Sequence, residues 1–521
     1  MPLLAPTPGH AAVARVKKVP LHAHSLLAHA AAVHPNTAVI SLSANGDKHT
    51  SSYAELAHNA LQRTEGLLAL GIAPGDTLCS IGLSSVAQLE VLYAALSVGA
   101  CTHLMNPQFA AEDAVALTRC AEPRVLLHDA VTADLARHVH ALLGAQTALL
   151  STEATWPAPA VARAGAPGVR SGFGPAINFP EETPAFVCYS SGTTGTPKAV
   201  EYTHRSTVLH AWACALPDAL NLSAADRVMP LMQLYHASAW GAPFVSPLVG
   251  AALVLVPPHR DPGQWYRWIE DHGITVLGAV TAHWVALASY MRLHRLRFST
   301  LRRTVVGGTR LTPDVAQWIA DTLHVEVRHA WGMTETSPLA TVESYRPGSM
   351  ILRHGKPVFG IELSLLGAIP TSPRLGELQV RGHWVAHRSA AEQGWLRTGD
   401  LATLSVDGHW EVLDRLDDAV ATSDRLISSA LVEHEARSVD GVADAALLVL
   451  HDTDRSSVLA LVLVPDSDVE TTLARVRERV IATFDGWLPE HIVEIDAFPY
   501  TPSAKVQKHL LRRSLATGLA A

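Results

Sequence analysis

The sequence predicts an α/β fold in which largely parallel sheets are flanked by helices. Three observations lead to this class. Apolar, β-prone runs such as Thr77–Ile81 alternate with helical segments such as Val86–Val98, glycine-containing turns separate them, and the same order recurs along the chain. With 521 residues, of which 48% are hydrophobic, the chain can pack two or more domains.

Local signals define the first elements. Ser52 is a suitable cap for an amphipathic helix that begins at Tyr53. Residues 71–76 are typical of a turn, and the buried strand at 77–81 is followed by the helix at 86–98 and another strand at 124–127. Residues 157–180 are rich in alanine, glycine and proline without periodicity, which predicts a loop.

Composition excludes several classes of function. The net charge of −8 provides no basic field, so nucleic acid and anionic membranes are poor partners. The five cysteines form no Cys-x-x-Cys pair and are expected to be reduced core thiols. No export signal or membrane-spanning run is present, so we expect a cytoplasmic protein. The 28 histidines are scattered and contain no His-Glu-x-x-His, so a zinc hydrolase has no support.

One stretch is suited to binding phosphate. A short apolar strand at 185–189 leads into hydroxyls and glycines that end in a lysine: Ser190, Ser191, Gly192, Thr193, Thr194, Gly195 and Lys198. Glycines let backbone N–H groups point into an anion-binding concavity, and the hydroxyls add donors. The spacing differs from that of a Walker loop. By itself, the same composition also suits a polar surface turn.

Other strands also run into glycine and then into polar groups. These are Gly308-Thr309-Arg310 after one strand, and Trp331-Gly332-Met333-Thr334-Glu335 at the end of the next. His236 lies close to Trp240 after another apolar run, although a lone histidine is usually a satisfied core residue. Because ligands collect at the carboxyl ends of strands in α/β sheets, we expect one nucleotide site there, with Glu335 able to reach a cation such as Mg²⁺.

The last third of the chain makes the arrangement recognisable. Residues 394–401 read Gly-Trp-Leu-Arg-Thr-Gly-Asp-Leu, residues 407–418 contain Asp414-Arg415-Leu416-Asp417-Asp418, and residues 500–505 read Tyr-Thr-Pro-Ser-Ala-Lys. In motifs and in their order, the chain resembles the adenylate-forming superfamily of acyl-CoA synthetases, peptide-synthetase adenylation domains and luciferases. The resemblance covers residues 52–508.

The resemblance implies a role for each matching residue. The stretch from Ser190 to Lys198 would hold phosphate, Gly308, Thr309 and Arg310 would line the adenine, and Trp331 would stack on it, followed by Gly332 and Met333. Thr334 and Glu335 match the phosphate and magnesium positions, Asp400 the acceptor of the ribose hydroxyls, Arg415 the arginine near ribose and phosphate, His236 the acyl-pocket histidine and Lys505 the catalytic lysine. The expected cofactors are ATP and Mg²⁺, with AMP and pyrophosphate as products.

The resemblance also implies two domains. A large N-terminal domain, residues 1–416, would combine parallel sheets flanked by helices with a small β-barrel-like part. A small, mobile α+β domain, residues 417–521, would turn about a hinge at Asp417 and carry Lys505. Gly307, Gly308 and Gly332 should leave flat space beside aromatic side chains, which predicts a planar, aromatic acid as substrate.

The chain departs from the family just after the hinge. CoA-using relatives have a Ser-Gly-Gly-x-Arg-like segment there, whose glycines let the pantetheine arm pass. This chain has Thr422-Ser423-Asp424-Arg425-Leu426, so Ser423 and Asp424 replace both glycines. A charged side chain at a position that needs no Cβ would obstruct the arm and repel the phosphates of CoA. CoA is therefore a doubtful partner.

An amine is the alternative acyl acceptor, and it needs a base because an alkylamine is mostly protonated at neutral pH. Glu201, close after the phosphate loop, is the candidate base, although an exposed carboxylate at a strand edge would have the same sequence signature. On this interpretation the chain is similar to β-carboline amide bond synthetases and joins a carboxylic acid to an amine. An aryl- or fatty-acyl-CoA ligase and a non-catalytic adenylate binder are the alternatives.

Overall fold

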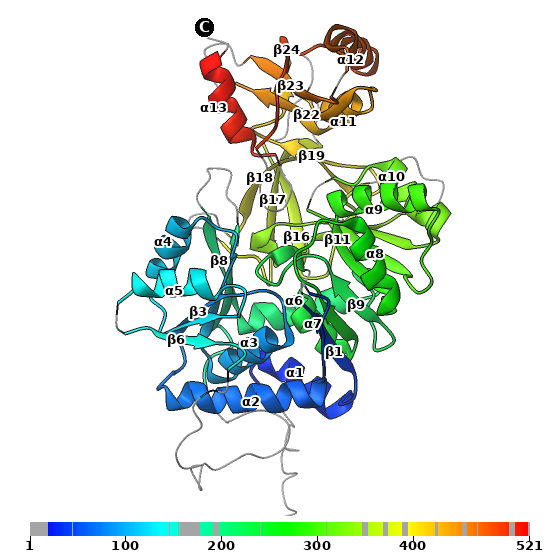
Figure 1. The fold of residues 1–521 in the computed structure, drawn as a ribbon. Coiled ribbons are helices and arrows are strands. Elements are labelled where there is room, and N and C mark those ends of the chain that lie inside the picture. Colours follow the sequence, from blue (N-terminus) through cyan, green and yellow to red (C-terminus); the bar gives the residue numbers. More distant parts are fainter. Residues whose placement is uncertain are drawn as a thin grey trace, which may run out of the picture.

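Two large sheets form the body of the protein, and a small domain lies above them (Figure 1). The computed structural model describes residues 19–43, 45–144, 146–154, 156, 178–190, 197–239, 241–308, 310–345, 353–367, 374–387, 394–422, 426–450, 456–465, 467–499 and 506–518. In this part of the chain, no helix is long and apolar enough to cross a membrane.

The first large sheet carries the phosphate-loop hairpin at its edge. Its six strands, in spatial order, are β6 (Ala148–Ser151), β5 (Val125–His128), β3 (Thr77–Ile81), β4 (Cys101–Met105), β7 (Pro184–Ser190) and β8 (Lys198–Thr203). Neighbouring strands are parallel except β7 and β8. The helices of this region are α2 (Tyr53–Ala69), α3 (Val86–Val98), α4 (Ala111–Ala121) and α5 (Ala133–Ala141). The predicted cap at Ser52 is confirmed, because its hydroxyl accepts from Glu55 N in a capping box.

The second large sheet has nine strands. In order they are β15 (Lys356–Pro357), β14 (Thr341–Ser344), β13 (Glu326–Trp331), β12 (Arg303–Gly307), β11 (Val276–Val280), β9 (Arg227–Pro230), β10 (Ala252–Leu255), β1 (Ala38–Leu42) and β2 (Lys48–Ser52). Its central strands are parallel, so their carboxyl ends share one edge. Its helices are α1 (His24–Val33), α6 (His204–Ala215), α7 (Ala242–Val249), α8 (Pro262–Asp271), α9 (Thr281–His294) and α10 (Pro313–Gln317).

A four-stranded antiparallel sheet completes the large domain and leads to the small one. It contains β16 (Ile361–Leu366), β17 (Leu375–Gly382), β18 (Leu396–Leu404) and β19 (Trp410–Arg415). The dipeptide Asp407-Gly408 predicts a hairpin turn. This turn is confirmed between β18 and β19, where Gly408 has a φ of 82° that favours glycine. The expected α/β fold with a large N-terminal and a smaller C-terminal domain is thus correct.

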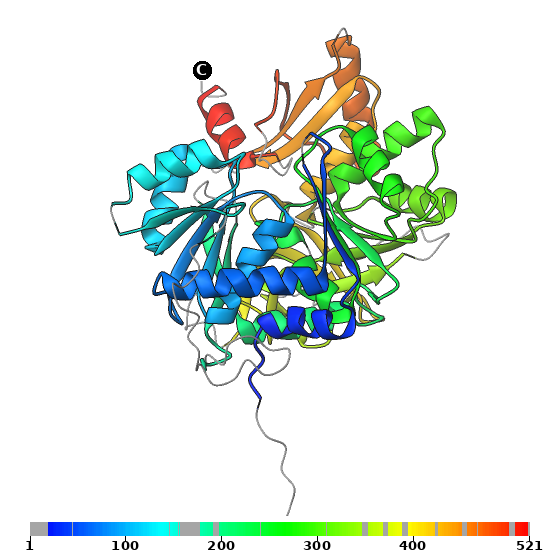
Figure 2. The same ribbon diagram turned by 60° about the horizontal axis from the view of Figure 1, so that its bottom comes forward.

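The small domain is an α+β unit at the C-terminal end (Figure 1; orange to red). It contains β20 (Val420–Ala421), β21 (Leu426–Ile427), α11 (Ser429–Arg437), β22 (Val442–Val449), β23 (Ser457–Leu463), α12 (Val469–Thr483), β24 (His491–Glu494) and α13 (Lys508–Gly518). Figure 2, turned by 60°, shows this domain at the top of the view, with the blue helices α2 and α1 in the lower half of the large domain. Its own apolar core, which includes Val432, Leu447, Leu459 and Val476, packs α11 and α12 on the three-stranded sheet.

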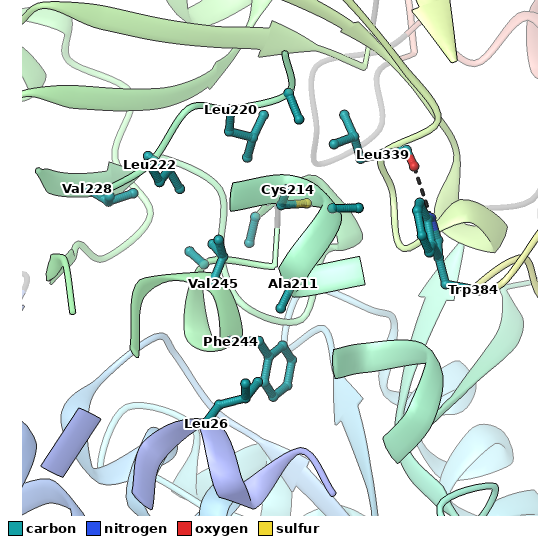
Figure 3. Packing of buried hydrophobic residues seen from close by; sticks show 14 of the residues in the cluster. Leu26, Ala211, Cys214, Leu220, Leu222, Val228, Phe244, Val245, Leu339 and Trp384 are labelled. Carbon is teal, nitrogen blue, oxygen red and sulfur yellow. Dashed lines mark hydrogen bonds between the residues drawn. The ribbon is translucent and has the colours of Figure 1, made fainter. Parts of the chain in front are cut away.

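The core of the large domain joins helices α1, α6 and α7 to the nine-stranded sheet. Figure 3 shows this packing through the labelled side chains of Leu26, Ala211, Cys214, Leu220, Leu222, Val228, Phe244, Val245, Leu339 and Trp384. The Trp384 indole N–H donates to the Leu339 carbonyl over 3.1 Å, so the one polar atom of this ring is satisfied although the side chain is only 3% exposed.

Several of the many histidines are buried in these cores as neutral rings. Burial lowers the pKa of His204 and His210 to about 3 and that of His329 to about 4. All three side chains are at most 3% exposed. A ring of this kind binds no proton in the folded protein at pH 5, whereas an unfolded histidine takes one up below about pH 6.5.

Acidification should therefore destabilise the fold well before the carboxylates are protonated. The unfolded chain binds more protons below pH 6.5, so each of these histidines should remove about 2 kcal/mol of unfolding free energy between pH 7.5 and pH 5. Urea unfolding at the two pH values measures the loss. Replacing His210 by leucine should reduce the pH dependence, whereas replacing the exposed His138 by glutamine should not. A stability that stays constant down to pH 5 would contradict this prediction.

Candidate active site

The nucleotide-binding residues expected from the sequence meet where β13 faces the four-stranded sheet. Trp331 ends β13, Asp400 lies in β18 and Arg415 ends β19. The Trp331 indole N–H donates to Asp400 Oδ2 over 3.1 Å, and Arg415 Nη1 lies 3.0 Å from Asp400 Oδ1. Asp400 is only 7% exposed. Three residues from two sheets therefore form one cluster around a buried carboxylate, with Arg415 on its exposed side.

Thr334 and Glu335 follow β13 in a short 3₁₀ turn, Thr334–Thr336. Glu335 is 2% exposed, and its carbonyl accepts from Ala386 N over 2.8 Å. The Tyr202 hydroxyl, from strand β8, donates to the Thr334 carbonyl over 2.7 Å. This bond ties the hairpin of the phosphate loop to the turn that carries Thr334 and Glu335. Tyr202 was not predicted from the sequence.

The ends of the phosphate loop lie side by side, because Ser190 of β7 pairs with Lys198 of β8. The Ser190 hydroxyl donates to the Lys198 carbonyl over 3.4 Å. The two strands therefore hold both ends of the loop at the edge of the six-stranded sheet. The predicted phosphate ligands Ser191, Gly192, Thr193, Thr194 and Gly195 lie outside the described residues.

Glu201 lies on the opposite face of its sheet from Tyr202. It pairs with Val187 and influences the pKa of Cys101, so it shares the face that α4 and α5 cover. Tyr202 shares the other face with Phe186 and reaches Thr334. Burial raises the pKa of the Glu201 carboxyl, although its side chain remains exposed at the edge strand. Its role as a base remains a prediction from sequence.

The remaining adenine-side residues have structural partners. Arg310 forms a 2.7 Å ion pair with Glu411 of β19, so its guanidinium links the two sheets. Gly308 has a φ of 83°, and Thr309 lies outside the described residues. A Cβ on Gly332 would lie 1.4 Å from the Pro338 carbonyl oxygen. Gly332 therefore permits close backbone packing, and the expectation that it leaves flat space for a substrate is wrong.

His236 is half-buried, and Ala239, three residues later, lines a small apolar cavity. Its ring lies 4.7 Å from that of Tyr235, and its carbonyl accepts from Ala239 N. The cavity has a volume of about 20 Å³ and separates α7 from the sheet. Its lining is entirely apolar apart from backbone atoms and consists of Leu220, Leu222, Val228, Pro230, Ala239, Ala242, Val245, Val276, Gly278 and Val305. Trp240 and the catalytic candidate Lys505 lie outside the described residues.

Hydrogen bonds from the small domain hold the segment that joins the two domains. Asp417 is exposed, and its carbonyl accepts from Arg512 of α13 over 3.1 Å. Three residues before Asp417, the Asp414 carboxylate accepts a hydrogen bond from the backbone N–H of Ser429 and another, over 3.0 Å, from the Ser429 hydroxyl. Lys508 in turn donates to the Ser429 hydroxyl over 2.9 Å. These contacts span the chain from β19 to α11 and α13, and sequence patterns gave no signal for them.

Removing the Tyr202 hydroxyl tests the link between the phosphate-loop hairpin and the Thr334 turn. We expect Tyr202→Phe to lose about 1 kcal/mol of unfolding free energy. We also expect it to weaken nucleotide binding several-fold, because the turn loses its anchor. Tyr93→Phe is a matched control, since the Tyr93 hydroxyl donates to the buried Pro243 carbonyl over 2.6 Å away from this site. Equal nucleotide affinity in both variants would contradict the prediction.

Comparisons with known proteins show the family to which this chain belongs. Residues 27–388 match the family model described as AMP-binding enzyme. A 3-methylmercaptopropionyl-CoA ligase from Ruegeria lacuscaerulensis is 31% identical, covering 95% of this chain and 97% of the relative. A medium-chain-fatty-acid–CoA ligase from Ectopseudomonas oleovorans is 30% identical, covering 94% and 95%.

Solved structures show the same fold at low sequence identity. The anthranilate CoA ligase AuaEII in complex with anthranoyl-AMP superposes with a TM-score of 0.80 at 20% identity, covering 96% of this chain and 99% of that one. The amide bond synthetase McbA from Marinactinospora thermotolerans gives 0.76 at 20% identity, covering 94% and 99%. Together with the cluster around Asp400, the match over residues 27–388 identifies this chain as a member of the AMP-binding, adenylate-forming enzyme family.

Proposed function

We propose that this adenylate-forming ligase activates an apolar, aromatic carboxylic acid with ATP and Mg²⁺ and transfers the acyl group to a free amine. In the first step the substrate carboxylate attacks the α-phosphorus of ATP, and pyrophosphate leaves. In the second step the amine nitrogen attacks the acyl carbonyl, AMP leaves, and a base takes the proton of the amine. The products are an amide, AMP and pyrophosphate.

The cluster of Trp331, Asp400 and Arg415 supports the nucleotide half of this proposal. A buried carboxylate flanked by an aromatic ring and a guanidinium suits a nucleoside, since it can accept from ribose hydroxyls while the ring stacks on the base. Glu335 fits the magnesium role. Mg²⁺ in nucleotide sites uses one or two carboxylates together with phosphate oxygens, and this carboxylate lies directly after the strand end that carries Trp331.

The small cavity near His236 supports only the apolar character of the acid. Val305 of β12 lines the cavity, and Gly307 and Gly308 lie at the carboxyl end of that strand. Ala239, three residues after His236, also lines the cavity. Carbon-lined space excludes charged substrates, because an unpaired charge there would lose its hydration. At about 20 Å³ the cavity holds about one water molecule, so it is too small to be the acyl pocket itself. The aromatic preference rests on the sequence, and faster adenylation of alkyl than of aryl acids would contradict it.

The observation that carries the choice of amine over CoA is the sequence after the hinge. Strands β20 and β21 pair Ala421 with Leu426. Between them the chain has Ser423 and Asp424 where CoA-using relatives have two glycines. A carboxylate there would repel the phosphates of CoA. Thioester formation is the second candidate, since the relatives at 30–31% identity are named as CoA ligases.

A competition experiment separates the two acceptors. Enzyme, ATP, Mg²⁺ and an aryl acid are incubated with CoA or with an arylalkylamine, and the products are identified by mass. We expect amide with the amine and little thioester with CoA. The double variant Ser423→Gly, Asp424→Gly should gain thioester formation by tenfold or more, since it removes the obstruction and the charge. Wild-type thioester formation as fast as amide formation would overturn the amide proposal.

Two single substitutions assign the steps. Lys505→Ala should abolish pyrophosphate release, because the lysine would neutralise charge that builds up on the α-phosphate. Glu201→Gln should leave pyrophosphate release intact and slow amide release, because glutamine cannot take a proton from the amine. Rates of both half-reactions are measured separately by pyrophosphate release and amide mass. Unchanged aminolysis in Glu201→Gln would show that another group is the base.

A further inference from the structure

The ring of Trp331 meets the nucleotide-site carboxylate with its edge. Its indole N–H donates to Asp400 Oδ2 over 3.1 Å, and the ring is 8% exposed. A phenylalanine or tyrosine ring at this position would offer a similar face for stacking but no indole N–H. The bond is therefore a property of tryptophan and is separate from any stacking on a base.

The other oxygen of Asp400 is held from the neighbouring strand of the same sheet, where Arg415 of β19 is paired with Asp400 of β18. Arg415 Nη1 lies 3.0 Å from Oδ1 and also donates to the Thr398 carbonyl over 2.9 Å, so the guanidinium is itself fixed. The Asp400 backbone N–H donates to the Thr398 hydroxyl over 3.0 Å. The backbone bond fixes the main chain at Asp400, and the donors on both oxygens fix the plane of the carboxylate, because rotation about the side-chain torsion would break at least one of the two carboxylate contacts.

We propose that Trp331 is a positioning residue that sets the plane of Asp400 and thereby makes the site selective for an intact ribose. Recognition of two vicinal hydroxyls by one carboxylate requires both oxygens to face them, and this requires a fixed plane. Without the indole N–H, the carboxylate keeps its ion pair with Arg415 but loses the bond that Trp331 donates to Oδ2. The inference rests on the proposed function, since it takes Asp400 as the acceptor of the ribose hydroxyls of ATP.

The chain provides a matched control. Trp384 belongs to the same core cluster, is 3% exposed, and donates its indole N–H over 3.1 Å to the Leu339 carbonyl (Figure 3). Trp384→Phe therefore removes a buried indole hydrogen bond of the same length and the same number of ring atoms. It does not touch Asp400 through that bond. A general effect of losing a buried tryptophan would appear in both variants.

The test compares the dissociation constants of ATP and 2′-deoxy-ATP by calorimetry in the absence of acid. The wild type should bind ATP more tightly than 2′-deoxy-ATP. The ratio of the two dissociation constants should fall about tenfold in Trp331→Phe and stay unchanged in Trp384→Phe. An isostere that lacks the N–H, β-(3-benzothienyl)alanine at position 331, keeps the shape and should show the same loss. An unchanged preference in folded Trp331→Phe or in the isostere would overturn the inference.

A double-mutant cycle with Asp400→Asn shows whether Trp331 acts through Asp400. The quantity compared is the preference for ATP over 2′-deoxy-ATP. If Trp331 acts through Asp400, Trp331→Phe should reduce this preference less in the Asp400→Asn background than in the wild type. Additive losses would overturn the inference and indicate stacking alone. A wild-type protein that binds no ATP would instead overturn the proposed function, and the inference with it, so the two failures are distinguished before any variant is compared.

Discussion

A buried carboxylate must find donors, and in this protein that requirement connects the sheets. Asp400 lies in the four-stranded sheet, yet one of its donors comes from the nine-stranded sheet and another from the strand that leads to the small domain. Removing one of these donors would weaken the compensation of a carboxylate that is only 7% exposed. The proposed nucleotide site therefore also connects two sheets, so its residues contribute to stability whether or not a ligand is bound.

A hydrogen bond also connects the six-stranded sheet to this site. Tyr202 of β8 reaches the Thr334 carbonyl, so the strand that follows the phosphate loop is bonded to the turn that follows Trp331. The six-stranded sheet thus contributes strand β8, and the nine-stranded sheet contributes the carboxyl end of β13. This arrangement explains how residues more than a hundred positions apart in sequence, such as Tyr202 and Thr334, act together.

Much of the fold could be predicted from the sequence because its signals are local. The cap at Ser52, the strand at 77–81 and the turn at Gly408 depend on neighbouring residues and appear where expected. The partners of the site could not be predicted in this way. Nothing local to Tyr202 indicates a bond to Thr334, and the crowding by Pro338 that requires Gly332 arises only in the folded chain. The same holds for the face on which Glu201 lies.

The contacts of Asp414 have a consequence for the junction between the large and the small domain. The Asp414 carboxyl is packed against Ser429 of the small domain, and burial raises its pKa to about 6. Any movement that separated Ser429 from Asp414 would expose the carboxyl to water, where its pKa would return toward about 4. Such a movement would release a proton between about pH 4 and pH 6, so acid in that range would retain the arrangement seen here, and raising the pH further would have no additional effect.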